Sequence, residues 1–222
     1  MSRPKAAISW SGGKDSCAAL MRAQRDFDVV AMVTMFDESG GRSRSHGLRP
    51  EILEAQGERL GMRTFVSRCS WATYDEAFAD ALLRLPANIT HVVFGDILYD
   101  EHRAWAEAMC RRSQRVAVEP LFGASTERLF VEWVAGGGEA TIVTTRAERL
   151  DRSWLGRRLS LDMLDDFGRL GVDPCGERGE YHTVVTRCGM FRGPVMLEWG
   201  EPVRVSDCWA LDAVLVNPAL DR

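Results

Sequence analysis

The first two thirds of the chain alternate between short apolar runs and segments with helical periodicity. Apolar runs at 6–10, 29–35, 63–66, 91–94, 116–118 and 140–144 predict strands, and the segments 15–25, 50–60, 74–85, 102–112 and 126–135 predict helices. Near-continuous apolar strands are typical of a parallel sheet that is covered on both faces. We therefore expect an α/β fold with an open parallel sheet sandwiched by helices, in a domain spanning residues 1–150.

The pattern changes after residue 150. A helix is expected at 160–170, followed by a loop rich in glycine and glutamate at 173–183 and by a β-hairpin formed by 195–199 and 202–207. This mixture predicts a small C-terminal α+β segment over residues 151–222, which we expect to bind substrate.

Composition narrows the class of protein. With 45% hydrophobic and 27% charged residues, the 222-residue chain does not have the composition of a disordered or collagen-like protein. No apolar run approaches the ~20 residues of a membrane span, and the run Ala6–Trp10 is too short for a signal-peptide core. We expect a soluble cytoplasmic protein without a membrane partner.

Charge and metal-ligand spacing exclude two further classes of partner. The chain has 28 basic and 32 acidic residues, and a net charge of −4 argues against a nucleic-acid partner. Six cysteines and four histidines are scattered without zinc-ligand spacing. We therefore expect reduced thiols and no metal-ligating residues.

A glycine turn follows the first predicted strand and precedes the first predicted helix. It consists of Ser11, Gly12, Gly13, Lys14, Asp15 and Ser16. Two glycines let backbone N–H groups approach an anion, the serines add hydroxyl donors, and the helix N-terminus adds its dipole. Lys14, one of only two lysines among the 28 basic residues, adds a point charge. A Walker A loop and a dinucleotide fingerprint are both excluded by spacing, so the turn predicts a phosphate site of another kind.

This turn resembles the PP-loop of the ATP pyrophosphatase superfamily, whose adenine nucleotide alpha hydrolase-like fold has a Rossmann-like sheet. By that resemblance ATP and Mg²⁺ are the cofactors, and the loop holds the departing pyrophosphate. Lys14 would stabilise the developing charge, Asp15 would take part in catalysis, and the backbone of 30–35 would line the adenine pocket.

Further motifs resemble the diphthine–ammonia ligase family over residues 5–200. They are His46-Gly47, Gly95-Asp96-Ile97, the pattern R-x-W-x-E-x-x-C at 103–110, Glu119–Phe122 and Asp173–Thr183. The chain has His182 where the ligase proper has a glutamate. In this respect it resembles the bacterial branch of the family, part of which is associated with cobalamin metabolism.

The loop at 173–183 is the most informative segment after the glycine turn. Its candidate substrate-binding residues are Glu177, Gly179, Glu180, Tyr181, His182 and Thr183. Its carboxylates could hold an ammonium group or act as the base that frees the lone pair of ammonia, and His182 could do the same near neutral pH. We expect Glu180 to be the first candidate base and Tyr181 to pack. A solvent-exposed charged loop is the alternative interpretation.

Three residues outside these two loops are candidate nucleotide contacts. Gly95 and Asp96 follow a predicted strand, at the end where open α/β sheets bind ligands. His46 lies in a loop at 37–47 that could close over ATP as a lid. For Asp96 the alternative is a helix cap, so its contact with the nucleotide stays open, as does that of His46.

These observations together favour an ATP-dependent, AMP-forming amide ligase. The carboxylate of a small molecule or a protein would be adenylated, and ammonia or an amine would displace AMP. A PP-loop tRNA-thiolating enzyme is one alternative, but the scattered cysteines and the acidic net charge count against it. An ATP-binding sensor without turnover is another, but it has little use for the 177–183 cluster. Homodimer formation stays open.

Overall fold

The computed structural model describes residues 2–216 and divides them into two compact units. The first unit contains 2–11, 15–45 and 61–124, and the second contains 12–14, 46–60 and 125–216. Both units therefore draw on the N-terminal half of the chain, and this division differs from the predicted boundary at residue 150.

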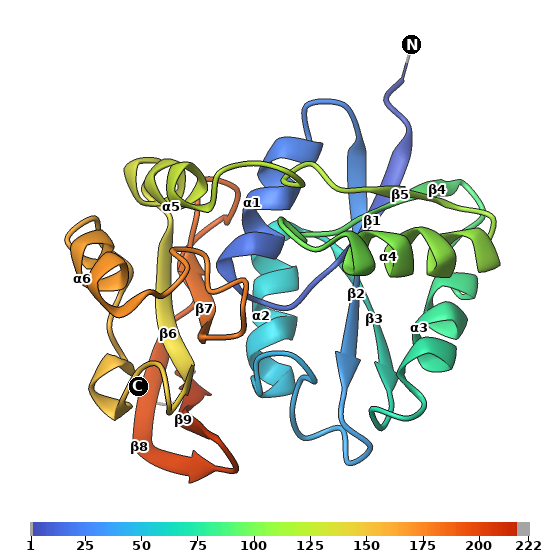
Figure 1. Ribbon diagram of the computed structural model, residues 1–222. Coiled ribbons are helices and arrows are strands. Elements are labelled where there is room, and N and C mark those ends of the chain that lie inside the picture. The colour runs from blue at the N-terminus through green and yellow to red at the C-terminus, as the bar shows by residue number, and fades with distance from the viewer. Residues whose placement is uncertain (1, 217–222) are drawn as a thin grey trace. The chain divides into compact units, whose positions relative to one another are not determined.

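The first unit is built on a five-stranded parallel sheet (Figure 1). Its strands are β1 (Lys5–Ser9), β2 (Asp28–Phe36), β3 (Arg63–Arg68), β4 (Ile89–Val93) and β5 (Val116–Val118), in the order β3-β2-β1-β4-β5. The helices α1 (Lys14–Ala23), α3 (Tyr74–Leu83) and α4 (Asp100–Arg112) connect them, Lys14 itself being grouped with the second unit. The predicted α/β fold with an open parallel sheet is confirmed for these five strands.

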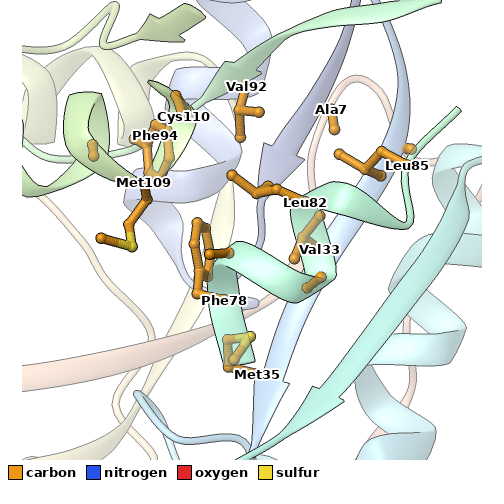
Figure 2. Packing of buried hydrophobic residues seen from close by; sticks show 14 of the residues in the cluster. Ala7, Val33, Met35, Phe78, Leu82, Leu85, Val92, Phe94, Met109 and Cys110 are labelled. Atoms are coloured by element: carbon orange, nitrogen blue, oxygen red, sulfur yellow. The ribbon is translucent and has the colours of Figure 1, made fainter. Parts of the chain in front are cut away.

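The core of the first unit lies between the sheet and the pair of helices α3 and α4, as Figure 2 shows. Val33 and Val92 contribute from the strands, and Phe78 and Leu82 from α3. All four side chains are at most 1% exposed, and burying each contributes about 1.5–3 kcal/mol. Cys110 of α4 packs in the same cluster, where burial raises the pKa of its thiol to about 12. This cysteine is a packing residue.

The second unit is built on an antiparallel sheet in the order β7-β6-β9-β8. The strands are β6 (Glu139–Arg146), β7 (Tyr181–Arg187), β8 (Leu197–Val205) and β9 (Cys208–Leu215). The unit also contains α2 (Pro50–Leu60), α5 (Thr126–Ala135), the 3-10 turn η1 (Arg152–Trp154) and α6 (Met163–Leu170). The predicted C-terminal α+β character is confirmed.

Two expectations about strands are wrong. The run 140–144 was expected to extend the parallel sheet, but β6 pairs antiparallel with β7 and β9. The two halves of the expected hairpin, 195–199 and 202–207, lie largely within the single strand β8, whose partner β9 comes later. Pro202 lies at a register shift in an edge strand, where a residue without an N–H is tolerated.

Two properties of the described residues bear on the class of protein. Between residues 2 and 216, no helix has the length and apolar character that crossing a membrane requires. All six cysteines lie within the same range, where none of them forms a disulfide and five are buried.

Candidate active site

The carboxyl ends of β1 and β4 mark the place where a sheet of this order binds ligands. In the order β3-β2-β1-β4-β5, the crossovers diverge between β1 and β4, which leaves room outside the strand ends. Within the first unit, Ser11 follows β1 and Gly95 follows β4 at this point.

Gly95 allows the end of β4 to approach the start of α1. A Cβ atom at Gly95 would lie 2.9 Å from both the carbonyl carbon of Asp15 and the backbone nitrogen of Ser16. The Ser16 hydroxyl in turn lies 3.2 Å from the hydroxyl of Ser11. A side chain at position 95 would displace the first turn of α1, whose N–H groups are the expected anion donors.

Asp96 places a second carboxylate near Asp15 in the first unit. Burial raises the pKa of Asp96, and the charge of Asp15 raises it further. His102 acts in the opposite direction, since its Nδ1 lies 3.1 Å from Asp96 Oδ1. Asp96 therefore belongs to a charged group of side chains rather than to a simple helix cap, because the residue that caps α4 is Tyr99.

The segment Gly12–Lys14 is held by residues of the second unit. The carbonyl of Gly12 accepts hydrogen bonds from Gln56 Nε2 (3.0 Å) and from the backbone N–H of Val185 (2.9 Å). The backbone N–H of Lys14 donates to Thr183 Oγ1 over 3.1 Å. Gly12 has a φ of +85°, which favours glycine. The conformation of the glycine turn is thus fixed by α2 and β7.

The ammonium group of Lys14 is withdrawn from solvent. The residue is 3% exposed, its Nζ donates to the carbonyl of Cys175, and the same atom lies 5.2 Å from the centre of the Tyr181 ring. The buried ammonium group places a positive charge at the glycine turn, where it can attract an anion.

His46 lies beside Gly13 in the same unit. A Cβ atom at Gly13 would lie 2.3 Å from His46 Cε1, so the loop can pass here only with a glycine. Nδ1 of His46 lies 2.7 Å from the carbonyl of Thr183 and therefore carries the hydrogen, which leaves Nε2 as an acceptor. Burial lowers the pKa of His46 to about 4, and the charge of Lys14 lowers it too. The imidazole is neutral near pH 7, and it stacks on His182 at 4.6 Å.

The loop at 173–180 is ordered by two internal carboxylates. Asp173 Oδ1 accepts from the N–H of Cys175 (2.8 Å), and Asp173 Oδ2 accepts from the hydroxyl of Thr126 (2.7 Å). Glu180 is fully buried, and its two oxygens accept from the N–H groups of Asp173 and Arg178, each at 3.0 Å. The carboxylate of Glu180 is thus engaged in holding the loop, which favours a positioning role over the predicted role as a base.

The remaining candidate residues of this segment differ in their exposure. Glu177 and His182 are half-buried, Gly179 has a φ of +77°, and Tyr181 donates from its hydroxyl to the carbonyl of Pro174. Tyr181 to Thr183 open β7 instead of continuing the loop. The expectation that Tyr181 packs agrees with its exposure of 2%.

The structure therefore gathers the candidates into two groups. The first unit contains Ser11, Asp15, Ser16, Gly95 and Asp96; the second contains Gly12, Gly13, Lys14, His46, Glu177, Gly179, Glu180, Tyr181, His182 and Thr183. Sequence reasoning missed Gln56 as a support of the turn, although a glutamine on the apolar side of the 50–60 helix was a visible signal. It also missed the Cys175 carbonyl, which no sequence pattern identifies.

Comparison with known proteins identifies the family to which this chain belongs. Residues 4–115 match the diphthamide synthase N-terminal domain, and residues 125–212 match the diphthamide synthase C-terminal domain. This chain belongs to the diphthamide synthase family. The predicted resemblance to the diphthine–ammonia ligase family is confirmed.

Curated relatives within this family are named diphthine–ammonia ligase. The protein from Mus musculus is 30% identical, with 87% of this chain and 82% of the relative covered. The protein from Rattus norvegicus is 28% identical over the same shares. The protein from Schizosaccharomyces pombe is also 28% identical, but this chain, of which 88% is covered, spans only 36% of its length.

A solved structure with a partly similar fold is a predicted subunit of a tRNA methyltransferase from Methanocaldococcus jannaschii. The alignment covers 83% of this chain and 98% of that chain, with 13% identity and a TM-score of 0.44. This similarity is too low to bear on function.

Proposed function

We propose that the chain is an ATP-dependent, AMP-forming amide ligase that joins ammonia or an amine to a substrate carboxylate. The observation that carries the proposal is the fixed turn Gly12–Lys14. Its Gly12 carbonyl is held by Gln56 and Val185, its Lys14 N–H by Thr183, and its ammonium group is buried. A preorganised cation and oriented backbone groups are what a phosphoryl or adenylyl transition state needs most.

The reaction runs in two steps. A substrate carboxylate oxygen attacks the α phosphorus of ATP, the bond to the bridging oxygen breaks, and pyrophosphate leaves. Ammonia or an amine then attacks the acyl carbon, AMP leaves, and one proton is released. No protein nucleophile forms a covalent bond, so Cys17, fully buried in α1, is a packing residue.

Lys14 would act on the departing pyrophosphate. Its Nζ, which donates to the Cys175 carbonyl, would donate to phosphate oxygens, which carry more negative charge. Ser11, Asp15 and Ser16 belong to the same continuous turn, and Gly95 supports the start of α1, so these residues would complete the nucleotide site together with Asp96. In the second unit, His46 lies beside Gly13 and would support the same turn.

The second group of side chains would handle the substrates. Glu180 positions the loop, which leaves the half-buried Glu177 and His182 as the groups that approach substrate. The relatives are named for ammonia, so we propose ammonia as the nitrogen donor. We propose no single acid substrate, because His182 stands where the ligase proper has a glutamate. A small-molecule acid and a protein side chain both fit the proposal.

Mg²⁺ fits the carboxylates of the first unit. Among residues 2–216 no three side chains of His, Cys, Asp or Glu are placed to hold a metal ion together. Mg²⁺ at nucleotides takes one or two carboxylates and otherwise phosphate oxygens and waters. Asp15 would supply one such carboxylate, because it lies in the glycine turn and is close enough to Asp96 for its charge to raise the pKa of that residue. When bound, the ion would neutralise charge on the phosphates.

The remaining expectations form part of the same proposal. We propose that the enzyme acts in the cytoplasm on soluble substrates and needs no nucleic-acid partner, which the net charge of −4 supports. Light scattering on the full chain would show whether it forms a homodimer.

The test is product analysis. The full chain is incubated with ATP, Mg²⁺, ammonium and a pool of carboxylates from cell extract, and AMP, pyrophosphate, ADP and phosphate are quantified. We expect AMP and pyrophosphate in a substrate-dependent manner, with a loss of at least 100-fold in Lys14→Ala. Lys5→Ala, which changes the only other lysine, is the matched control and should leave the rate unchanged. ADP and phosphate as products would refute adenylation, and ATP binding without products would favour a sensor.

A further inference from the structure

The ends of β4 and β5 bring two carboxylates to the same edge of the first unit's sheet. Val93 pairs with Val118 in parallel register, and the N–H of Phe94 donates to the carbonyl of Val118 over 2.9 Å. Asp96 and Glu119 therefore leave neighbouring strands at the same level.

Glu119 has a buried carboxylate oxygen without a partner. Its side chain is 6% exposed, and Oε2 lies 3.4 Å from Arg103 Nε. Oε1 is buried and makes no hydrogen bond within residues 2–216. Buried polar atoms are almost always paired, because leaving one unpaired costs its full desolvation. Among these residues, a hydrogen-bond donor is therefore missing next to Glu119 Oε1.

Arg103 does not neutralise this region alone. The same Nε lies 3.4 Å from Glu107 Oε1, and the guanidinium lies 4.9 Å from the centre of the Phe122 ring. Burial raises the pKa of Glu119, and the charges of Asp96 and Glu107 raise it further. Arg103 thus pairs with both Glu119 and Glu107, and Glu107 also lies 3.6 Å from Arg111 Nη1. The charge of Asp96 acts on Glu119 as well.

Asp96 is the more exposed of the two carboxylates: its side chain is 31% exposed, against 6% for Glu119, and its Oδ1 lies 3.1 Å from His102 Nδ1. The terminal torsion of a glutamate is broad and roughly two-fold, so the carboxylate of Glu119 can turn without backbone movement. A small cation that reaches Asp96 can in this way be shared with Glu119.

We propose that Asp96 and Glu119 form the ammonium site of the enzyme. Ammonium is singly charged, no larger than water, and carries four N–H donors, which suits two neighbouring carboxylates. Mg²⁺ carries twice the charge, so Arg103 would repel it more strongly than it repels ammonium, and Mg²⁺ also demands an octahedral set of oxygens. The inference deepens the proposed ligase function, on which it rests, by naming the residues that hold its nitrogen donor.

The site also accounts for a proton. Bound ammonium gives one proton to Oε1 of Glu119 and becomes neutral ammonia with a free lone pair. The protonated carboxyl group then loses that proton to water after ammonia has left. A carboxylate with a raised pKa accepts a proton more readily than an exposed one.

Direct binding tests the site without turnover or knowledge of the acid. Thermal unfolding of the full chain is followed in ammonium chloride and, at equal ionic strength, in tetramethylammonium chloride, which has the same charge but no N–H donors. We expect ammonium alone to raise Tm, by about 3–6 °C at ten times its dissociation constant. Glu119→Gln should abolish the rise, and Glu107→Gln, the matched control at the same arginine, should keep it.

Three outcomes would overturn the proposal. These are no rise with ammonium, an equal rise with both salts, and a rise that survives in Glu119→Gln. A shift produced by Mg²⁺ and lost in Glu119→Gln would show a metal site instead. If Glu119→Gln does not fold, Asp96→Asn serves in its place with the same expectation.

The binding result is independent of the proposed function. If ammonium binds at Glu119 but no AMP forms with any acid, the ligase assignment fails while the site stands. If AMP does form, Glu119→Gln should raise the KM for ammonium about tenfold or more and leave the KM for ATP unchanged. An unchanged KM for ammonium would overturn the proposal although the enzyme is a ligase.

Discussion

Replacing Gln56 by glutamate should make the stability of the protein strongly dependent on pH. Gln56 is fully buried, and its Nε2 donates to two carbonyls, those of Gly12 (3.0 Å) and Val185 (2.8 Å). A glutamate of the same shape would direct a carboxylate oxygen at both carbonyls. Only the protonated form could donate, and it could satisfy only one of them.

The magnitude follows from these contacts. Losing two hydrogen bonds costs about 2 kcal/mol at about 1 kcal/mol each, and Gln56→Leu should show this loss alone. For Gln56→Glu, burial raises the folded-state pKa of the new carboxyl group above its unfolded value. The contribution of this carboxyl group to the free energy of unfolding is therefore fully present below its pKa in the unfolded chain. It falls by about 1.4 kcal/mol per pH unit as pH rises from there to its pKa in the folded protein.

Urea denaturation at pH 5 and pH 7 measures the effect. Relative to Gln56→Leu, the glutamate variant should lose a further ~2.7 kcal/mol between these pH values, if its folded-state pKa exceeds 7. Taking the difference between the two variants cancels groups that titrate in both, including His46. A pH-independent difference would refute the reasoning, because it would mean that the side chain at position 56 does not face the two carbonyls.

Two further predictions concern the residues around the turn. Because the pKa of His46 is about 4 in the folded protein, the unfolded chain binds this proton first as pH falls. The free energy of unfolding, measured by urea denaturation, should therefore drop by about 3 kcal/mol from pH 6.5 to pH 4, and His46→Gln should remove this part of the pH dependence. Gly12→Ala should lower the free energy of unfolding by about 2–4 kcal/mol, because the new Cβ would lie 2.6 Å from Leu53 Cδ2 at a φ of +85°. Gly47→Ala, at a φ of +67° with open space around it, should lower it by only about 1 kcal/mol, and equal losses would contradict this reasoning.

The sequence was informative where burial alone determines structure. β1 and β2 are largely apolar and buried, so their composition identifies them and the parallel fold together, whereas β3 is a mostly polar strand at the edge of the sheet. The run 140–144 is equally apolar, because Ala140, Ile142 and Val143 are buried between other elements, and composition does not reveal strand direction. β9 was missed because its alternation is weak and its partner β8 contains a proline.

The sequence indicated candidate residues for the site but not the contacts that each of them makes. Lys14 and Gly12 are identified by spacing, since a phosphate loop requires them at fixed positions. Glu180 was expected to be a base, and only the structure shows its two oxygens occupied by N–H groups of its own loop. Glu119 was noted only as part of the motif Glu119–Phe122, because its unpartnered oxygen depends on the burial that neighbouring strands create.

The membership of Gly12–Lys14 and α2 in the second unit limits how such proteins can be recombined. The two family domains meet near residue 120, which suggests a point where a gene could be cut and rejoined. The C-terminal half, however, contributes Thr183 and Val185 to the glycine turn and depends on Gln56 from the other half. A chimaera joined at that point inherits a turn from one parent and its supports from another. Exchange between relatives should therefore succeed only when residues 12–14 and 46–60 travel with the C-terminal domain.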